Sequence, residues 1–280
     1  MLETAISKQT GFAHLTDLPC IKLQHGTASA VVSLYGAQVL SYQPEPGKEL
    51  LWLSPKAQWH NQGAIRGGVP VCWPWFGPAG AAFNPAQDAL PNHGLVRNRL
   101  WQLIQQHSGA TAASLTLMTE LDNLPYHSGS VKLQLCLTLT DSLSIALSCN
   151  SRMPQQAALH SYFALDNIAS AAVRPLPDSY YDKVSDSMQQ NGSKVVRITS
   201  ETDRIYPDSA AQLRVDSDSS QLALTQTGHD ATVVWNPWQD KSAAIADLTA
   251  DSYRQFICVE TARLSSAAST LALTQQIKAL

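Results

Sequence analysis

Strict alternation of apolar and polar residues is the pattern that most constrains this chain. It is longest in Val131–Leu139, where a valine or leucine occupies every second position, and it resumes in Leu143–Cys149. Asp141 and Ser142 separate the two runs and are typical of a turn. Because successive side chains of a strand point to opposite faces, each run can bury one face. The segment therefore predicts a long antiparallel hairpin.

Ten shorter segments carry weaker versions of the same alternation. Glycine, proline, asparagine and aspartate stand between many of them, as expected for strands joined by turns. The predicted strands are Cys20–Leu23, Ala30–Leu34, Val39–Gln43, Leu115–Met118, Ala172–Pro175, Val195–Ile198, Gln221–Leu224, Thr232–Trp235, Phe256–Glu260 and Leu271–Gln276.

Helical periodicity is weak throughout the chain. We expect short helical turns only near Ser54–Asn61 and Pro207–Gln212, and polar loops at Asp178–Asp186 and Asp216–Ser220. The absence of a strand/helix rhythm argues against a parallel α/β sheet, and no repeat of 20–50 residues is visible. The pattern favours an all-β chain, with residues 1–280 forming a single domain built as a large antiparallel β-sandwich.

The composition excludes several classes of function. Of the 280 residues, 44% are apolar, which is enough for a sizeable core, and the net charge is −3. Nonspecific binding to nucleic acid requires a basic face, so a nucleic-acid partner is not expected. No stretch approaches the roughly 18 apolar residues of a membrane helix, so no membrane partner is expected either.

The cysteines and the N-terminus indicate a cytoplasmic protein. The N-terminal residues lack a basic segment followed by an apolar run, which a signal peptide would need. The five cysteines are scattered and show neither a CxxC pair nor a Cys/His metal spacing. We expect reduced thiols, no metal site and a monomer.

The segment Gln62–Trp101 has the composition of a ligand-binding wall. It holds three arginines, one histidine, three tryptophans and six glycines in forty residues. Arginine matches anionic oxygens, and aromatic faces pack against rings. Among loops rich in glycine and proline, these residues predict a pocket for an anionic, ring-shaped ligand.

Two clusters in this segment each allow two interpretations. Arg66 precedes Gly67 and Gly68, which let the backbone approach a ligand closely; the alternative is a packed aromatic corner with Arg66 on a surface carboxylate. His93 lies next to a glycine and four residues before Arg97, which favours function modestly over a structural histidine.

Two titratable residues lie in apolar runs further along the chain. His160, on a strand, would point opposite to Leu159 and Ser161, as either a hydrogen-bonded core histidine or a buried general acid. Glu260 ends the apolar strand Phe256–Val259, where a carboxylate is costly to desolvate. Burial would raise its pKa and an arginine would lower it; the alternative is a surface glutamate at the end of a strand.

Taken together, these fragments resemble the glucose-6-phosphate 1-epimerase family, also called D-hexose-6-phosphate mutarotases, within the aldose 1-epimerase superfamily. The matching pieces occur in the family's order between Gly36 and Ala262. They are GAQVLSY, LLWLSP, AIRGGVPVCWPWFG, HGLVRNRLW, LHSYFAL, ETDRIY, VVWNPW and ICVETA.

The resemblance implies a fold and a set of site residues. The fold is a large antiparallel β-supersandwich of the galactose mutarotase-like kind, with sugar bound across a concave face and no cofactor. His160 matches the catalytic histidine and Glu260 the catalytic glutamate. His93 matches a supporting histidine beside the sugar, and Trp73, Trp75 and Trp235 either floor the pocket or only pack. The positions that match substrate-binding residues are Arg66, Asn92, Arg97 and Asp203.

The implied activity is interconversion of the α and β anomers of an aldohexose 6-phosphate, most directly glucose 6-phosphate. The partner would then be a small sugar phosphate. Arg66 and Arg97 are the candidates for the phosphate, and Arg99 or Lys183 could join them. Three alternatives stay open: a noncatalytic sugar-phosphate-binding protein, an epimerase of unphosphorylated hexose, and a glycoside hydrolase using Asp203 and Glu260 as its two carboxylates.

Overall fold

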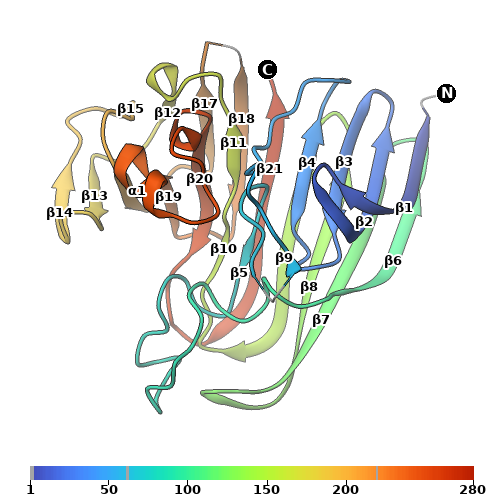
Figure 1. Ribbon diagram of the computed structural model, residues 1–280. Helices are drawn as coiled ribbons and strands as arrows, with labels where there is room; N and C mark the ends of the chain where they lie inside the picture. Colours follow the sequence, from blue (N-terminus) through green and yellow to red (C-terminus); the bar gives the residue numbers. More distant parts are fainter. Residues whose placement is uncertain (1–2, 61–62, 219) are drawn as a thin grey trace.

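A computed structural model describes residues 3–60, 63–218 and 220–280, and it contains three β-sheets (Figure 1). The four-stranded sheet has the order β1 (Thr4–Phe12), β2 (Leu15–His25), β3 (Ala28–Ser33) and β4 (Val39–Gln43). The eight-stranded sheet has the order β14 (Ser187–Gln190), β13 (Ser179–Asp182), β16 (Thr202–Pro207), β19 (Ala231–Asn236), β20 (Phe256–Arg263), β10 (Ala157–Leu159) and β5 (Val71–Cys72), and β11 (Tyr162–Ala164) also pairs with β20.

The third sheet has nine strands and is the largest. Its order is β15 (Val196–Arg197), β12 (Ala172–Arg174), β17 (Gln212–Asp216), β18 (Gln221–Thr227), β21 (Ser269–Ala279), β9 (Leu143–Met153), β8 (His127–Leu139), β7 (Ala113–Leu124) and β6 (Gln102–Ser108). In the described residues the helical elements are α1 (Trp238–Ala244) and two 3₁₀ turns, Ile168–Ser170 and Ser252–Arg254.

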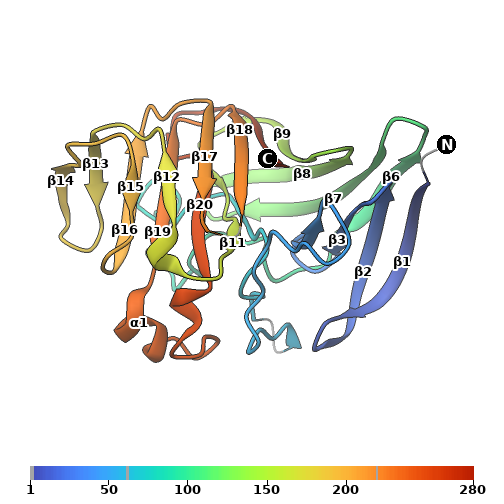
Figure 2. The same cartoon turned by 90° about the horizontal axis from the view of Figure 1, so that it is seen from above.

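The two smaller sheets cover different parts of the nine-stranded sheet (Figure 2). Strands β10 and β20 contact β21, whereas β1, β2 and β3 contact β6, β7 and β8. One continuous apolar core runs between the layers and includes residues of all three sheets. Pairing between the named strands of the described residues is antiparallel throughout, so the all-β antiparallel prediction is confirmed.

The long hairpin predicted from the alternation is confirmed as β8 and β9. Leu135 pairs with Leu147, and Leu139 pairs with Leu143 across the turn. The leucines of both strands are buried, while Gln134 and its polar counterparts face outward. The ten weaker strand predictions each overlap an observed strand.

Several elements escaped prediction because their residues are too polar or too few to show a period. β6 is a nearly fully exposed edge strand, and β13, which pairs with the following β14, lies within the segment Asp178–Asp186 where a polar loop was expected. That prediction was wrong because the hairpin lies at the edge of its sheet and buries few side chains. β1, β16 and β17 were also not predicted.

Of the two predicted helical turns, one is present and one is absent. Ser54–Ala57 forms a turn closed by a hydrogen bond from the Ala57 N–H to the Ser54 carbonyl, His60 has a 3₁₀ conformation, and Asn61 lies outside the described residues. Pro207–Gln212 joins β16 to β17 without a helix. Helix α1 was missed because seven residues are too short for a helical stripe. Gln62 and Ser219, which also belong to predicted segments, lie outside the described residues.

Among the described residues, no helix is long and apolar enough to cross a membrane.

The hairpin provides a direct test of the core. Leu135 is fully buried, so we expect Leu135→Ala to lower the free energy of unfolding by about 2–5 kcal/mol through lost burial and a residual cavity. The adjacent Gln134 is exposed, and Gln134→Ala should change the free energy by about 0.5 kcal/mol or less. Urea denaturation of both variants measures the difference, and equal effects would contradict the assigned faces of β8.

Candidate active site

The register of β20 places His160 opposite Glu260. Strands β10 and β11 both pair with β20 and keep one continuous register across the short break between them. His160 lies in that break, at the position facing Glu260. Opposing residues of an antiparallel pair have their side chains on the same face. The Nε2 atom of His160 accordingly lies 3.3 Å from Oε1 of Glu260.

A second row of side chains lies beside this pair on the same face. Asp203 of β16 lies opposite Trp235 of β19. Trp235 in turn lies opposite Cys258 of β20, and Cys258 lies opposite Tyr162 of β11. Cys258 precedes Glu260 by two residues, so both rows point to the same side of the sheet. Sheet pairing alone therefore gathers the proposed acid/base pair with one more carboxylate and an indole.

Loops complete a cavity of about 390 Å³ over these two rows. Its walls come from the segment before β5, the long loop between β5 and β6, the turn between β13 and β14, and helix α1. The cavity brings together all seven residues singled out from the sequence: Arg66, Asn92, His93, Arg97, His160, Asp203 and Glu260.

Arg66 reaches the cavity because two glycines follow it. A Cβ atom on Gly67 would lie 2.4 Å from the carbonyl oxygen of Trp52, and the φ angle of Gly67 is +112°. Gly68 has φ +61° and a similarly close backbone neighbour. Only glycine fits this path without moving the backbone, and the segments that these glycines approach closely are the backbone at Trp52 and Val39, so their approach to a ligand stays a prediction.

The guanidinium of Arg66 is held by two neighbours. Its Nε lies 3.0 Å from Oδ1 of Asp247, and its Nη1 donates to the Tyr162 hydroxyl at 3.1 Å. Both sequence interpretations were thus partly right, because Arg66 contacts a half-exposed carboxylate and still lines the cavity.

Arg97 differs from the other cations of the cavity. Arg66, Lys183 and Lys241 each contact a carboxylate oxygen, at 3.0, 3.2 and 2.7 Å respectively. Arg97 donates to the carbonyl oxygen of Asn92 at 2.7 Å, and it makes no ion pair within the part of the chain that the structure describes. Its positive charge is therefore the least compensated in the cavity.

His93 is held as a neutral donor. Its Nδ1 accepts a hydrogen bond from the Gly77 N–H at 3.2 Å, which leaves the ring proton on Nε2. Burial, followed by the nearby cations Arg97, Lys183 and Arg66, lowers the pKa of His93 to about 3. A neutral imidazole at this position can donate to a ligand oxygen without taking part in proton exchange near neutral pH.

The His160–Glu260 pair is almost fully buried, and burial dominates its titration. Desolvation lowers the pKa of His160 well below 6.5, with further contributions from His93 and the arginines. Desolvation raises the pKa of Glu260 well above 4.5, and Asp203 adds to that increase. In both groups burial disfavours the charged form, which shifts the balance toward a neutral pair.

Each member of the pair has one deeply buried polar atom that no described residue satisfies. In the described residues, Nδ1 of His160 and Oε2 of Glu260 have no hydrogen-bond partner. The imidazole stacks on the ring of Tyr162, with centroids 4.9 Å apart and planes 10° from parallel. An oriented imidazole and a carboxyl group with open acceptor and donor positions can move protons on a bound molecule.

Two local expectations need correction. His160 is not on a strand but in the break between β10 and β11, where the Ser161 N–H bonds to the Leu159 carbonyl at 3.0 Å and the His160 N–H bonds to the Pro70 carbonyl at 3.0 Å. Glu260 does not end its strand, since β20 continues to Arg263, and the residue is 1% exposed. The surface-glutamate alternative is therefore wrong.

The tryptophans separate into two groups. Trp235 lines the cavity. Trp73 and Trp75 are fully buried, and their indole N–H groups donate to Gln155 and to the Pro91 carbonyl, so they pack instead of contacting a ligand.

The cavity also contains residues that the sequence did not single out. Lys183, which had been left open, lines it, whereas Arg99 donates to the Glu120 carbonyl elsewhere on the surface. Lys241 and Ile245 arrive from helix α1 and its C-terminal end, and no local pattern marks them.

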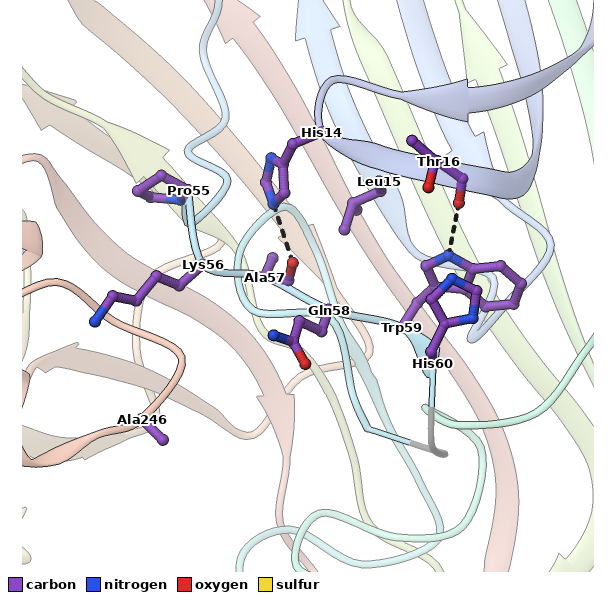
Figure 3. Close-up of a pocket in the computed structure, with 10 residues that line it drawn as sticks. All are labelled: His14, Leu15, Thr16, Pro55, Lys56, Ala57, Gln58, Trp59, His60 and Ala246. Carbon is purple, nitrogen blue, oxygen red and sulfur yellow. Dashed lines mark hydrogen bonds between the residues drawn. The ribbon is translucent and has the colours of Figure 1, made fainter.

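A second cavity also touches the loop that follows α1, because Ala246 lines it while Ile245 lines the first cavity (Figure 3). It measures about 590 Å³ and is lined by His14, Lys56, Trp59, His60 and five others, with Ala246 on its far wall. Figure 3 shows the Trp59 indole and the His14 ring bonded to backbone carbonyls. None of its described lining residues is a carboxylate, so paired acid/base chemistry belongs to the first cavity.

Comparison with known proteins identifies the family of the chain. The family model described as aldose 1-epimerase matches residues 19–279. The chain belongs to the aldose 1-epimerase family. A protein of Escherichia coli K12 named "Putative glucose-6-phosphate 1-epimerase" is 34% identical over 256 residues, which cover 90% of this chain and 85% of that protein.

Solved structures show the same fold. A structure titled as a putative mutarotase from Salmonella typhimurium superposes with a TM-score of 0.87 at 29% identity, covering 98% of this chain and 96% of the other. Galactose 1-epimerase of Lactobacillus acidophilus shares the fold with a TM-score of 0.72 at 17% identity, covering 100% and 99%. The chain is thus an isomerase of the epimerase/mutarotase type, on a galactose mutarotase-like β-sandwich.

The raised pKa of Glu260 predicts a pH-dependent cost in stability. The folded protein keeps this carboxyl protonated above its ordinary pKa of 4.5, so the protonated form stabilises it fully below pH 4.5. That contribution is lost as the pH rises toward the folded-state pKa. Because Gln mimics the neutral acid, we expect Glu260→Gln to unfold with a free energy about 1 kcal/mol or more above wild type at pH 8.

The difference between Glu260→Gln and wild type should shrink as the pH falls toward 5. Urea denaturation of both proteins at the two pH values measures it. A difference that is constant with pH, or larger at pH 5, would contradict the raised pKa.

Proposed function

We propose that this isomerase interconverts the α and β anomers of an aldohexose 6-phosphate, with glucose 6-phosphate as its principal substrate. The observation that carries the proposal is a buried His160–Glu260 contact at 3.3 Å inside a cavity lined by four cations. The names of the related proteins support the same substrate.

The chemistry needs two proton transfers around one sugar ring. Opening the pyranose removes a proton from the C1 hydroxyl and delivers one to the ring oxygen. Rotation about the C1–C2 bond then presents the other face of the aldehyde, and closure reverses both transfers. An acid and a base held on one bound ring perform both steps without a change in the net number of protons.

We assign the base role to the Glu260 carboxylate and the acid role to protonated His160. This charged form holds the same number of protons as the neutral pair, and a proton shift across the 3.3 Å contact converts one into the other. Developing charge on the substrate favours the charged form during reaction, and Lys183 and Arg97 favour its Glu260 carboxylate. The roles reverse on ring closure, and the pair returns to its starting state.

The remaining polar groups would hold the ring. Asp203 presents a carboxylate to sugar hydroxyls, and its side chain is about 15% exposed, so most of its surface is already desolvated. His93 would donate through Nε2 to a sugar oxygen, and Asn92 stands at the exposed rim. Trp235 offers an apolar surface beside the pair.

For the phosphate we propose Arg97 as the main anchor. Its guanidinium has no carboxylate partner in the described residues, so a phosphate would not have to displace an existing ion pair. A planar guanidinium also matches phosphate oxygens in two-point contacts. Arg66 is already held by Asp247 and Tyr162, which favours a place beside the acid/base pair.

An unphosphorylated aldohexose is the second candidate substrate. The matched family is described only as aldose 1-epimerase, and the acid/base pair acts on the ring regardless of the group at C6. The two candidates differ in how strongly the cations contribute to binding.

Anomer exchange tests the acid/base assignment. We expect wild type to accelerate α/β exchange of glucose 6-phosphate in NMR exchange spectra. Glu260→Gln and His160→Asn should each lower kcat by about 100-fold or more, because each removes one proton-transfer group. His107→Asn and Glu45→Gln, at exposed sites, serve as matched controls with unchanged rates. Near-normal exchange by both site variants, folded by circular dichroism, would contradict the assignment.

Comparison of phosphorylated and free glucose tests the phosphate anchor. We expect Arg97→Ala to raise KM for glucose 6-phosphate about 10-fold or more, with a much smaller change for glucose, because a charge-assisted contact is lost. Arg66→Ala should impair both sugars, and Arg197→Ala, on an exposed strand, neither. Equal changes for the two sugars in Arg97→Ala would exclude the phosphate role.

A further inference from the structure

A chain of buried polar side chains runs between the eight-stranded and nine-stranded sheets, on the opposite face of β20 from the cavity. Its members are hydrogen-bonded to one another and lie in an otherwise apolar layer. The members are Ser161, Gln275, Thr261, Gln226, Thr232 and Ser209.

Gln275 stands at the centre of this chain in place of an apolar residue. It lies on β21, where the inward positions on either side are Leu273 and Ile277. Burying an amide is unfavourable unless every polar atom finds a partner. Every polar atom of the Gln275 amide has a hydrogen-bond partner, whereas its neighbours on the same face are apolar and only pack. Packing of the core therefore does not explain why this position holds a polar residue.

The three hydrogen bonds of Gln275 go to the immediate neighbours of the proposed acid/base pair. Its Oε1 accepts from the Ser161 hydroxyl at 2.5 Å. Its Nε2 donates to the Val259 carbonyl at 3.3 Å and to Oγ1 of Thr261 at 2.8 Å. Ser161 follows His160, and Val259 and Thr261 flank Glu260. One side chain thus connects residues adjacent to both members of the pair.

The connection matters most at the break that carries His160. The N–H of Ser161 bonds within its own segment, to the Leu159 carbonyl at 3.0 Å, so this stretch has fewer ladder bonds than the strands around it. The Ser161 hydroxyl is its side-chain link to the opposite sheet. β20, by contrast, is paired with β19 along the Glu260 region.

We propose that Gln275, acting through Ser161, is a positioning residue that fixes the His160 segment against β20 and thereby sets the His160–Glu260 contact. The inference rests on the proposed function, since it assigns Gln275 to the same reaction. Gln275 does not touch substrate. Its amide links the two segments, because its oxygen accepts a hydrogen bond from the His160 segment and its nitrogen donates hydrogen bonds to the Glu260 strand.

The test compares two buried glutamines of the same chain. Gln275→Leu removes the link, and we expect kcat for anomer exchange to fall about 10-fold or more, because small displacements of reacting groups are costly. KM for glucose 6-phosphate should stay within about twofold. Gln226 is equally buried and bonds to Thr232 and Thr261, but not to Ser161 or Val259. Gln226→Leu should lose comparable stability with kcat nearly unchanged.

Two further variants separate positioning from stability. Ser161→Ala removes the same Ser161–Gln275 hydrogen bond with a smaller change of side-chain volume. This variant replaces Gln275→Leu in the test if Gln275→Leu does not fold. In the double variant Ser161→Ala/Gln275→Leu, both polar partners are replaced, so stability should partly recover. Turnover should stay low, which a purely structural role would not produce.

The ring nitrogens of His160, followed by ¹⁵N NMR of histidine-labelled protein, provide a readout independent of activity. We expect their shifts to move in Gln275→Leu and Ser161→Ala but not in Gln226→Leu. Unchanged His160 shifts and unchanged kcat in folded Gln275→Leu would overturn the proposal, as would equal losses of kcat in both glutamine variants. Absence of exchange by wild type would refute the proposed function, and the His160 shifts would still decide the positioning role.

Discussion

The antiparallel pairing of β10 and β11 with β20 is the constraint on which the site depends. It places His160 opposite Glu260 and lines up Asp203 and Trp235 in the adjoining row. A slip of one residue would turn these side chains into the core and bring core residues to the surface. The apolar layer between the sheets opposes such a slip, so core packing and site geometry fix the same register.

The electrostatic surroundings of His160 and Glu260 determine their protonation and therefore the chemistry that the pair can perform. Burial lowers the pKa of His160 and raises that of Glu260, which favours the neutral form of each, and the surrounding cations lie close enough to influence both groups. A site with this balance holds one proton that two atoms can exchange, which is the requirement for opening and closing a sugar ring in place. Three of the cations are already compensated by carboxylates, which leaves the charge of Arg97 available to a ligand.

The sequence predicted local structure where burial is regular and failed where contacts are distant. The β8–β9 hairpin followed from alternation alone, whereas the hairpin of β13 and β14 is an exposed edge without alternating burial. The seven site residues followed from ordered motifs of a known family, and the cavity collects them all. Lys241 reaches the cavity from a short helix, and no sequence pattern near this residue predicts its position in the cavity. The role of Gln275 likewise cannot be predicted from the sequence, because its hydrogen-bond partners lie on other strands.

The alternation along β20 has a consequence for how this molecule can diverge. Ile257 and Val259 belong to the apolar core, while Cys258 and Glu260 face the outer side. Most residues of the cavity wall come from loops and from α1, and these wall residues lie outside that core. They can therefore be exchanged at small cost in stability, so new sugar preferences are accessible by gradual change around the His160–Glu260 pair.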